Sequence, residues 1–117
     1  MGYRTLRCVI ALLAACLLAS PSWAAKWVPN PSQSGQWIDL DSRKAADPTD
    51  PEVLRFDVSL SVDPDTGQPS TEEDDLVIEL LNCSSGKRLM LLPMLDNQTR
   101  NLPTLSQQDP LLKLICG

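Results

Sequence analysis

The chain of 117 residues has no histidine, so imidazole is missing as a proton carrier, a nucleophile's partner and a metal ligand. That absence excludes histidine-based triads and most zinc sites. The sequence also has no glycine-rich phosphate loop and no dinucleotide fingerprint. Carboxylates are present, but they fall mostly in expected loops, and no pair is marked out for acid–base work. We therefore expect a protein that is not an enzyme and that uses no cofactor.

Basic residues are also few, and the first two lie in an N-terminal targeting segment. Arg4 and Arg7 precede the uninterrupted apolar stretch 8–19, and the segment 21–24 (Pro-Ser-Trp-Ala) supplies small residues at the −3 and −1 positions of a cleavage site. This layout predicts a secretory signal peptide over residues 1–24. A membrane-spanning helix is the alternative for this stretch, but the stretch is shorter than the roughly 20 apolar residues needed to cross a bilayer. We also expect no transmembrane segment in the mature chain.

A second processing site overlaps the first. Leu13-Ala14-Ala15-Cys16 matches the bacterial lipobox, in which Cys16 would be lipidated and become the first residue. Residues 17–19 continue the apolar run, whereas a lipoprotein usually has a polar tether there. We favour free export to the periplasm or the outer surface, with a lipid anchor on Cys16 as the alternative. A diacylglyceryl adduct on Cys16 at the mature N-terminus, detected by mass spectrometry, would show that the protein is lipid-anchored.

The mature chain is acidic and contains two cysteines. Residues 25–117 hold eight basic and fifteen acidic side chains, a formal charge of −7. Such a chain is poorly suited to neutralise phosphates, so we do not expect nucleic acid or anionic membranes as partners. We expect a protein partner instead. In an oxidising compartment Cys83 and Cys116 are expected to pair, which would stabilise the fold by roughly 3–4 kcal/mol on the chain-entropy model. Two buried free thiols are the alternative.

Two apolar runs form the centre of the expected fold. Residues 76–83 and 88–95 are separated by Ser84-Ser85-Gly86-Lys87, which predicts a β-hairpin with Cys83 at its tip. Neither run alternates cleanly, so we expect both faces of the hairpin to be covered. Pro93 lacks a backbone donor, so the second strand should end there or lie at an edge.

The remaining elements are shorter. Strict alternation of apolar and polar residues over 54–62 predicts a half-buried strand, and we expect two short strands at 26–29 and 36–41. Between them and the long strand, 42–46 favours one helical turn and 47–51 a loop.

The C-terminal segment favours a short helix. Residues 96–103 are expected to be a polar connection, after which Ser106 would cap the helix with Asp109 three residues on, and Pro110 is tolerated in the first turn. A strand is the alternative for this short run. We expect one α+β domain over 25–117, with a small antiparallel sheet of four to six strands, a C-terminal helix and one disulfide.

Two features could be functional sites, but for each we favour a purely structural interpretation. The acidic loop 63–75 offers oxygen ligands for calcium, but Asp63-x-Asp65-x-Gly67 lacks the later ligands of an EF-hand, so a solvated loop is expected. Trp27 and Trp37 could bind a partner at the surface. With one Phe and no mature Tyr in the chain, we expect both to be core residues instead.

The mature chain resembles the surface-adhesin protein E family of small exported bacterial proteins. The resemblance is carried by Trp27-Val28, by Trp-Ile-Asp-Leu-Asp-Ser over 37–42, by the long strand 53–62, by Cys83 and by the terminal Leu-Leu-Lys-Leu-Ile-Cys of 111–116. It implies an antiparallel sheet packed by helical segments, with the cysteines bridged. It also implies a cell-surface role, because one branch of the family binds host matrix or serum proteins. We expect a non-catalytic binding or adhesion-type module of the bacterial envelope, or alternatively an assembly accessory of an envelope complex.

Overall fold

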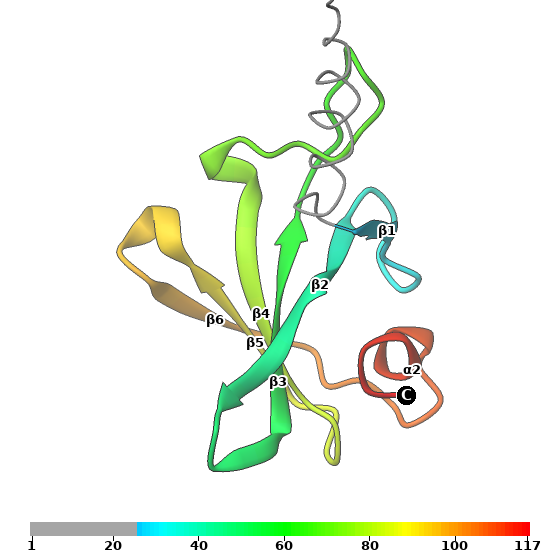
Figure 1. Cartoon of the computed structure of the whole chain (residues 1–117), viewed down its shortest axis with the longest axis vertical. Coiled ribbons are helices and arrows are strands. Elements are labelled where there is room, and N and C mark those ends of the chain that lie inside the picture. Colours follow the sequence, from blue (N-terminus) through cyan, green and yellow to red (C-terminus); the bar gives the residue numbers. More distant parts are fainter. Residues whose placement is uncertain (1–25) are drawn as a thin grey trace, which may run out of the picture.

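The structure is a computed structural model that describes residues 26–117. The predicted signal peptide and Cys16 lie outside the described residues. Six strands form one antiparallel sheet in which every strand pairs with its neighbours in the chain (Figure 1). The strands are β1 (Trp27–Pro29), β2 (Trp37–Asp47), β3 (Asp50–Ser59), β4 (Leu76–Asn82), β5 (Arg88–Leu92) and β6 (Gln98–Leu102). The fold is broadly α+β, although mostly β, because its one α-helix in this range, α2 (Pro110–Cys116), is short.

One face of the sheet carries the core. Burial alternates along β4, so that Val77, Glu79 and Leu81 are buried while their neighbours are half-buried. From β3, Phe56 and Val58 point to the same face, because the register pairs them with Glu79 and Val77. The apolar residues of α2 complete this core: Leu111, Leu112 and Ile115 are buried. We call this side of the sheet the covered face.

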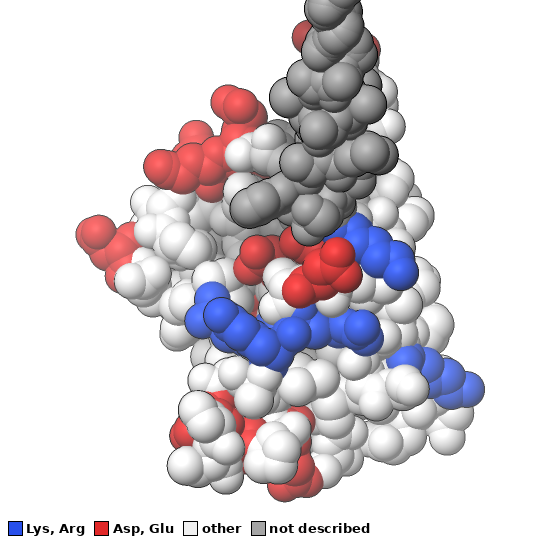
Figure 2. Space-filling view, viewed as in Figure 1, with Lys and Arg blue, Asp and Glu red and all other residues white. Residues whose placement is uncertain are grey.

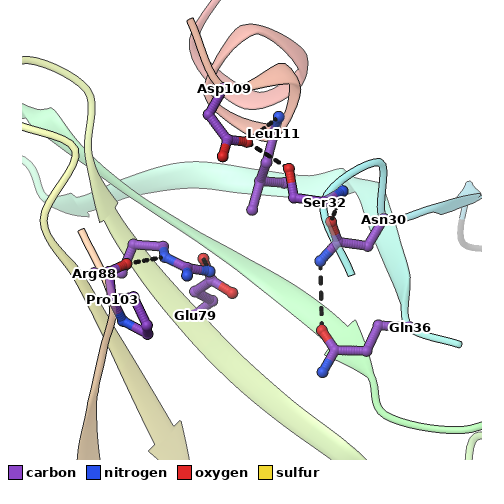
Figure 3. Close-up of polar contacts among 8 residues, drawn as sticks. All are labelled: Asn30, Ser32, Gln36, Glu79, Arg88, Pro103, Asp109 and Leu111. Carbon is purple, nitrogen blue, oxygen red and sulfur yellow. Dashed lines mark hydrogen bonds and ion pairs between the residues drawn. The ribbon is translucent and has the colours of Figure 1, made fainter. Parts of the chain in front are cut away.

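The helix begins one turn later than Ser106 would place it. Asp109 is the N-cap, and its carboxylate accepts a hydrogen bond from the Leu111 amide at 2.9 Å. The same carboxylate accepts a hydrogen bond from the Ser32 hydroxyl, which joins the helix to the β1–β2 loop (Figure 3). The prediction of Ser106 as the cap is therefore wrong, because Pro110 takes the first helical position and makes Asp109 the preceding residue. Placement of Pro110 in the first turn is confirmed.

The disulfide between Cys83 and Cys116 is present, with 5.8 Å between the two Cα atoms. Cys83 lies in the turn between β4 and β5, so the bond fastens the end of α2 to the tip of the predicted hairpin. The hairpin itself is confirmed, and β5 ends just before Pro93, where a single 3-10 turn (Pro93–Leu95) follows.

Several predicted boundaries are wrong. Residues 42–46 are not helical: β2 continues to Asp47, because Lys44 and Ala45 pair with β3 beyond a register shift. The expected loop 47–51 is reduced to a tight turn between β2 and β3. The expected connection 96–103 contains β6, which pairs along the whole of β5. The strand predicted over 54–62 begins at Asp50 and ends at Ser59.

An ion pair lies on the covered face. The Glu79 side chain is 2% exposed, and a guanidinium nitrogen of Arg88 lies 3.4 Å from its carboxylate (Figure 3). Arg88 also donates to the Pro103 carbonyl at 2.9 Å. Burial raises the pKa of Glu79, and the Arg88 guanidinium opposes that rise. The pair is structural in character, because it is enclosed between β4, β5 and the segment that leads to α2.

Candidate functional site

On the face of the sheet opposite α2, strands β4 and β5 carry an apolar surface that is half-buried rather than buried. Along β4 and β5, the alternate residues that do not enter the core are aliphatic except for Asn82 at the end of β4. The aliphatic ones are Leu76, Ile78, Leu80, Leu89 and Leu91, each with intermediate exposure. The expectation that both faces of the hairpin are covered is therefore wrong: only one face is fully buried. We call the other side the open face.

The open face is divided between aliphatic and charged strands. The registers place Trp27 opposite Asp39, Asp39 opposite Asp57, Asp57 opposite Ile78 and Ile78 opposite Leu91, which makes one row across five strands. Residues directly opposite in antiparallel strands lie about 4.5–5.5 Å apart and share a face. The row thus runs from an indole, through two carboxylates, to a pair of aliphatic side chains.

Like charges lie opposite each other twice on β2 and β3. Asp39 pairs with Asp57, and in the next row Lys44 pairs with Arg55. Like charges directly opposite each other destabilise a sheet. Within residues 26–117, none of these four side chains forms an ion pair within 4.0 Å. The sheet thus concentrates negative and positive charge in two adjacent rows at a cost in stability.

A hollow of about 310 Å³ opens at the acidic row. Its walls come from β1, β3 and β4, from the 3-10 turn that precedes β4 (Glu73–Asp75) and from the 3-10 turn that follows β5 (Pro93–Leu95). The lining residues are Trp27, Asp57, Glu73, Leu76, Val77, Ile78 and Pro93. The walls are mainly apolar, and the two carboxylates are its only charged groups.

Asp57 is a partly buried carboxylate of the hollow. Partial burial, and after it the neighbouring Asp39 carboxylate, raise the pKa of Asp57. Asp39 itself accepts hydrogen bonds from the amides of Lys26 and Asp41, both at 3.0 Å. Among the described residues, the carboxylates of Asp57 and Glu73 accept no hydrogen bond. Both therefore present free acceptors to whatever enters the hollow.

A second hollow of about 320 Å³ lies at the other end of the hairpin. It is lined by Val53, Leu80, Asn82, Lys87, Arg88, Leu89 and Asn101. Its charged lining residues are Lys87 and Arg88, and the Arg88 guanidinium is the one that pairs with Glu79 on the covered face. Figure 2 shows basic side chains in a band across the middle of the visible surface, with acidic groups above and below it.

The described carboxylates are dispersed and are not gathered into a metal site. Among residues 26–117, no three carboxylate or thiol side chains come together as a metal site would require. In the acidic loop, Asp63 accepts from the Asp65 amide at 2.8 Å and Asp75 accepts from the Ser70 hydroxyl at 2.6 Å, so these oxygens already serve the loop's own turns. The open face carries aliphatic side chains on β4 and β5 and charged side chains on β2 and β3.

The structure moves the two tryptophans out of the core. Trp27 and Trp37 are both half-buried, and neither belongs to the buried cluster. The prediction of core residues is wrong, because the register turns both side chains to the open face, where Trp27 lines the hollow. Sequence reasoning missed Asp57 and Ile78 as site residues. The alternation over 54–62 did place Asp57 away from the core, but only the register brings it beside Trp27 and Ile78.

No family model, no curated protein and no solved structure matches the chain. In the part of the chain that the structure describes, no helix is long and apolar enough to span a membrane.

Proposed function

We propose that the protein is a non-catalytic binding module of the bacterial envelope and that it contacts a partner protein through the open face. The observation that carries the proposal is the half-buried aliphatic surface of β4 and β5. A contiguous apolar patch rimmed by polar or charged residues is a mark of protein-interaction sites.

The sequence supports the cellular setting. A signal peptide over 1–24 would deliver the chain to an oxidising compartment, where the Cys83–Cys116 bond is stable. The likeness of the mature chain to the surface-adhesin protein E family favours an adhesion-type role on the periplasmic or outer surface. The same surface would equally serve an assembly accessory of an envelope complex, which is the alternative role.

Capture from envelope extracts tests the proposal. The processed protein is immobilised as wild type and as Ile78→Glu, which places a charge in the middle of the open face. We expect a discrete set of partners on the wild type and their loss from Ile78→Glu. Thr104→Glu, an exposed position away from the open face, is the control and should keep them. Equal capture by all three proteins contradicts the proposal.

The identity of the captured proteins separates the two roles. Endogenous envelope subunits, recovered in fixed proportion, favour the assembly accessory. Binding of purified host matrix proteins by the wild type, with loss in Ile78→Glu, favours adhesion.

A further inference from the structure

The hollow beside Trp27 combines apolar walls with carboxylates, so it is complementary to a ligand group that is both apolar and positively charged. We propose that it receives a basic side chain, arginine or lysine, carried between apolar residues on a segment of the partner protein. This inference rests on the proposed function and names the chemistry of its partner.

The walls fit the stem of such a side chain. Arginine and lysine bury their methylene groups along apolar surface and keep the charged head at a polar group. Trp27, Ile78 and Pro93 supply the apolar surface, and the hollow of about 310 Å³ has room for one long side chain. The indole of Trp27 also attracts a cation held over its face.

The carboxylates fit its head. Asp57 and Glu73 line the hollow, and Asp39 lies directly opposite Asp57 in the adjacent strand. Because Asp39 and Asp57 repel each other in the free protein, a bound cation adds its own attraction and also relieves that repulsion. The formal charge of −7 over residues 25–117 additionally favours the approach of a basic segment.

The neighbouring row restricts the position of the basic residue. Lys44 and Arg55 lie opposite each other beside the aliphatic residues Leu80 and Leu89. A second cation placed over that row would meet two positive charges. The partner segment therefore carries its basic side chain at the Trp27 end and apolar or acidic side chains toward Lys44.

Three short synthetic peptides test the inference. They have the sequence Ser-Leu-X-Leu-Ser with blocked ends, and X is Arg, Gln or Glu. Binding to the processed protein is followed by NMR through the indole N–H of Trp27. We expect the Arg peptide to bind at least about tenfold more tightly than the Gln peptide, a preference worth about 1.4 kcal/mol. The Glu peptide should bind most weakly.

Two variants with the same change in charge locate the effect. Asp57→Asn should remove most of the preference for the Arg peptide, and it should fold well because it relieves the repulsion by Asp39. Asp65→Asn, in the exposed turn after β3, should leave the preference unchanged. Equal losses in both variants would show a general effect of net charge and overturn the inference.

The remaining outcomes separate this inference from the proposed function. If the Arg and Gln peptides bind equally well and Ile78→Glu abolishes the binding of both, the preference for a basic side chain is overturned. The open face would then still be an apolar binding surface, as the proposed function requires. No binding of any peptide overturns the inference, and the capture experiment then decides the proposed function alone. A dimer in sedimentation equilibrium that Ile78→Glu dissociates would make a second copy the occupant of the face, which also overturns it.

Discussion

At the scale of single residues, Asp109 shows how one side chain can serve two elements. Its carboxylate caps α2 through the Leu111 amide and accepts the Ser32 hydroxyl from the β1–β2 loop. These hydrogen bonds, that from Ser32 foremost, lower the pKa of Asp109. We therefore expect Asp109→Ala to lower the free energy of unfolding by about 1 kcal/mol, the usual cost of a lost N-cap.

Ser106 is the matched control for that change, because it is the cap that the sequence alone suggests. Ser106→Ala should leave the free energy of unfolding within about 0.5 kcal/mol of the wild type, as exposed substitutions usually do. Urea denaturation measures both variants. A larger effect from Ser106→Ala than from Asp109→Ala contradicts the assignment of the cap.

Glu79 gives a prediction about pH. Burial raises its pKa in the folded state above the ordinary value of 4.5. The folded protein thus holds this proton more tightly than the unfolded chain does. The resulting stabilisation is fully present below the unfolded pKa and is lost as pH rises through the folded pKa. In Glu79→Gln this decline in stability on going from acidic to neutral pH should disappear.

Denaturant unfolding at several pH values from 4 to 8 measures the effect as the difference between variant and wild type. The exposed Glu72, changed to Gln, is the control and should follow the wild type. A difference between Glu79→Gln and the wild type that is the same at every pH would show that Glu79 does not titrate in this range.

At the scale of elements, α2 depends on tertiary contacts. Seven residues are too few for a helix to persist alone in water. Three buried apolar side chains and the Cys83–Cys116 bond hold it against the sheet. The bond closes a segment of 33 residues and should contribute roughly 3–4 kcal/mol by restricting the unfolded chain.

The double variant Cys83→Ala/Cys116→Ala should therefore unfold at a clearly lower guanidinium concentration than the wild type. Proteolysis of the folded variant should begin at the C-terminal segment, because α2 then detaches before the sheet opens. If the unfolding midpoint is unchanged, the bond does not contribute to stability as described.

The elements also show what the sequence could predict. The hairpin, its turn and the stop at Pro93 follow from composition and from the missing proline donor, and they are confirmed. The strand residues Arg43–Ala46 and the whole of β6 could not be predicted in this way. Their residues have weak strand propensity, and pairing with β3 and β5 makes them strands.

The open face was beyond prediction for a related reason. Two apolar runs without alternation suggest burial on both sides, and nothing in the sequence says that α2 covers only one of them. The charged rows depend on the register between β2 and β3, which contains a shift after Asp39. A periodic pattern finds the faces of one strand, but it cannot find which side chains meet across strands.

At the scale of the whole molecule, a single sheet has one face in the core and one face available to a partner. The covered face, α2 and the disulfide supply the stability. The open face supplies aliphatic surface on β4 and β5 and separated charge on β2 and β3. The central claim is that this second face is the contact surface for another protein.

Site-specific photo-cross-linking in living cells tests that claim most directly. A benzophenone amino acid replaces Ile78 on the open face or Thr104 on the exposed C-terminal segment, and adducts of the processed protein are identified after irradiation. The account predicts a discrete adduct with another protein from position 78 and none of the same mass from position 104. The absence of any adduct from position 78, or the same adducts from both positions, would contradict it.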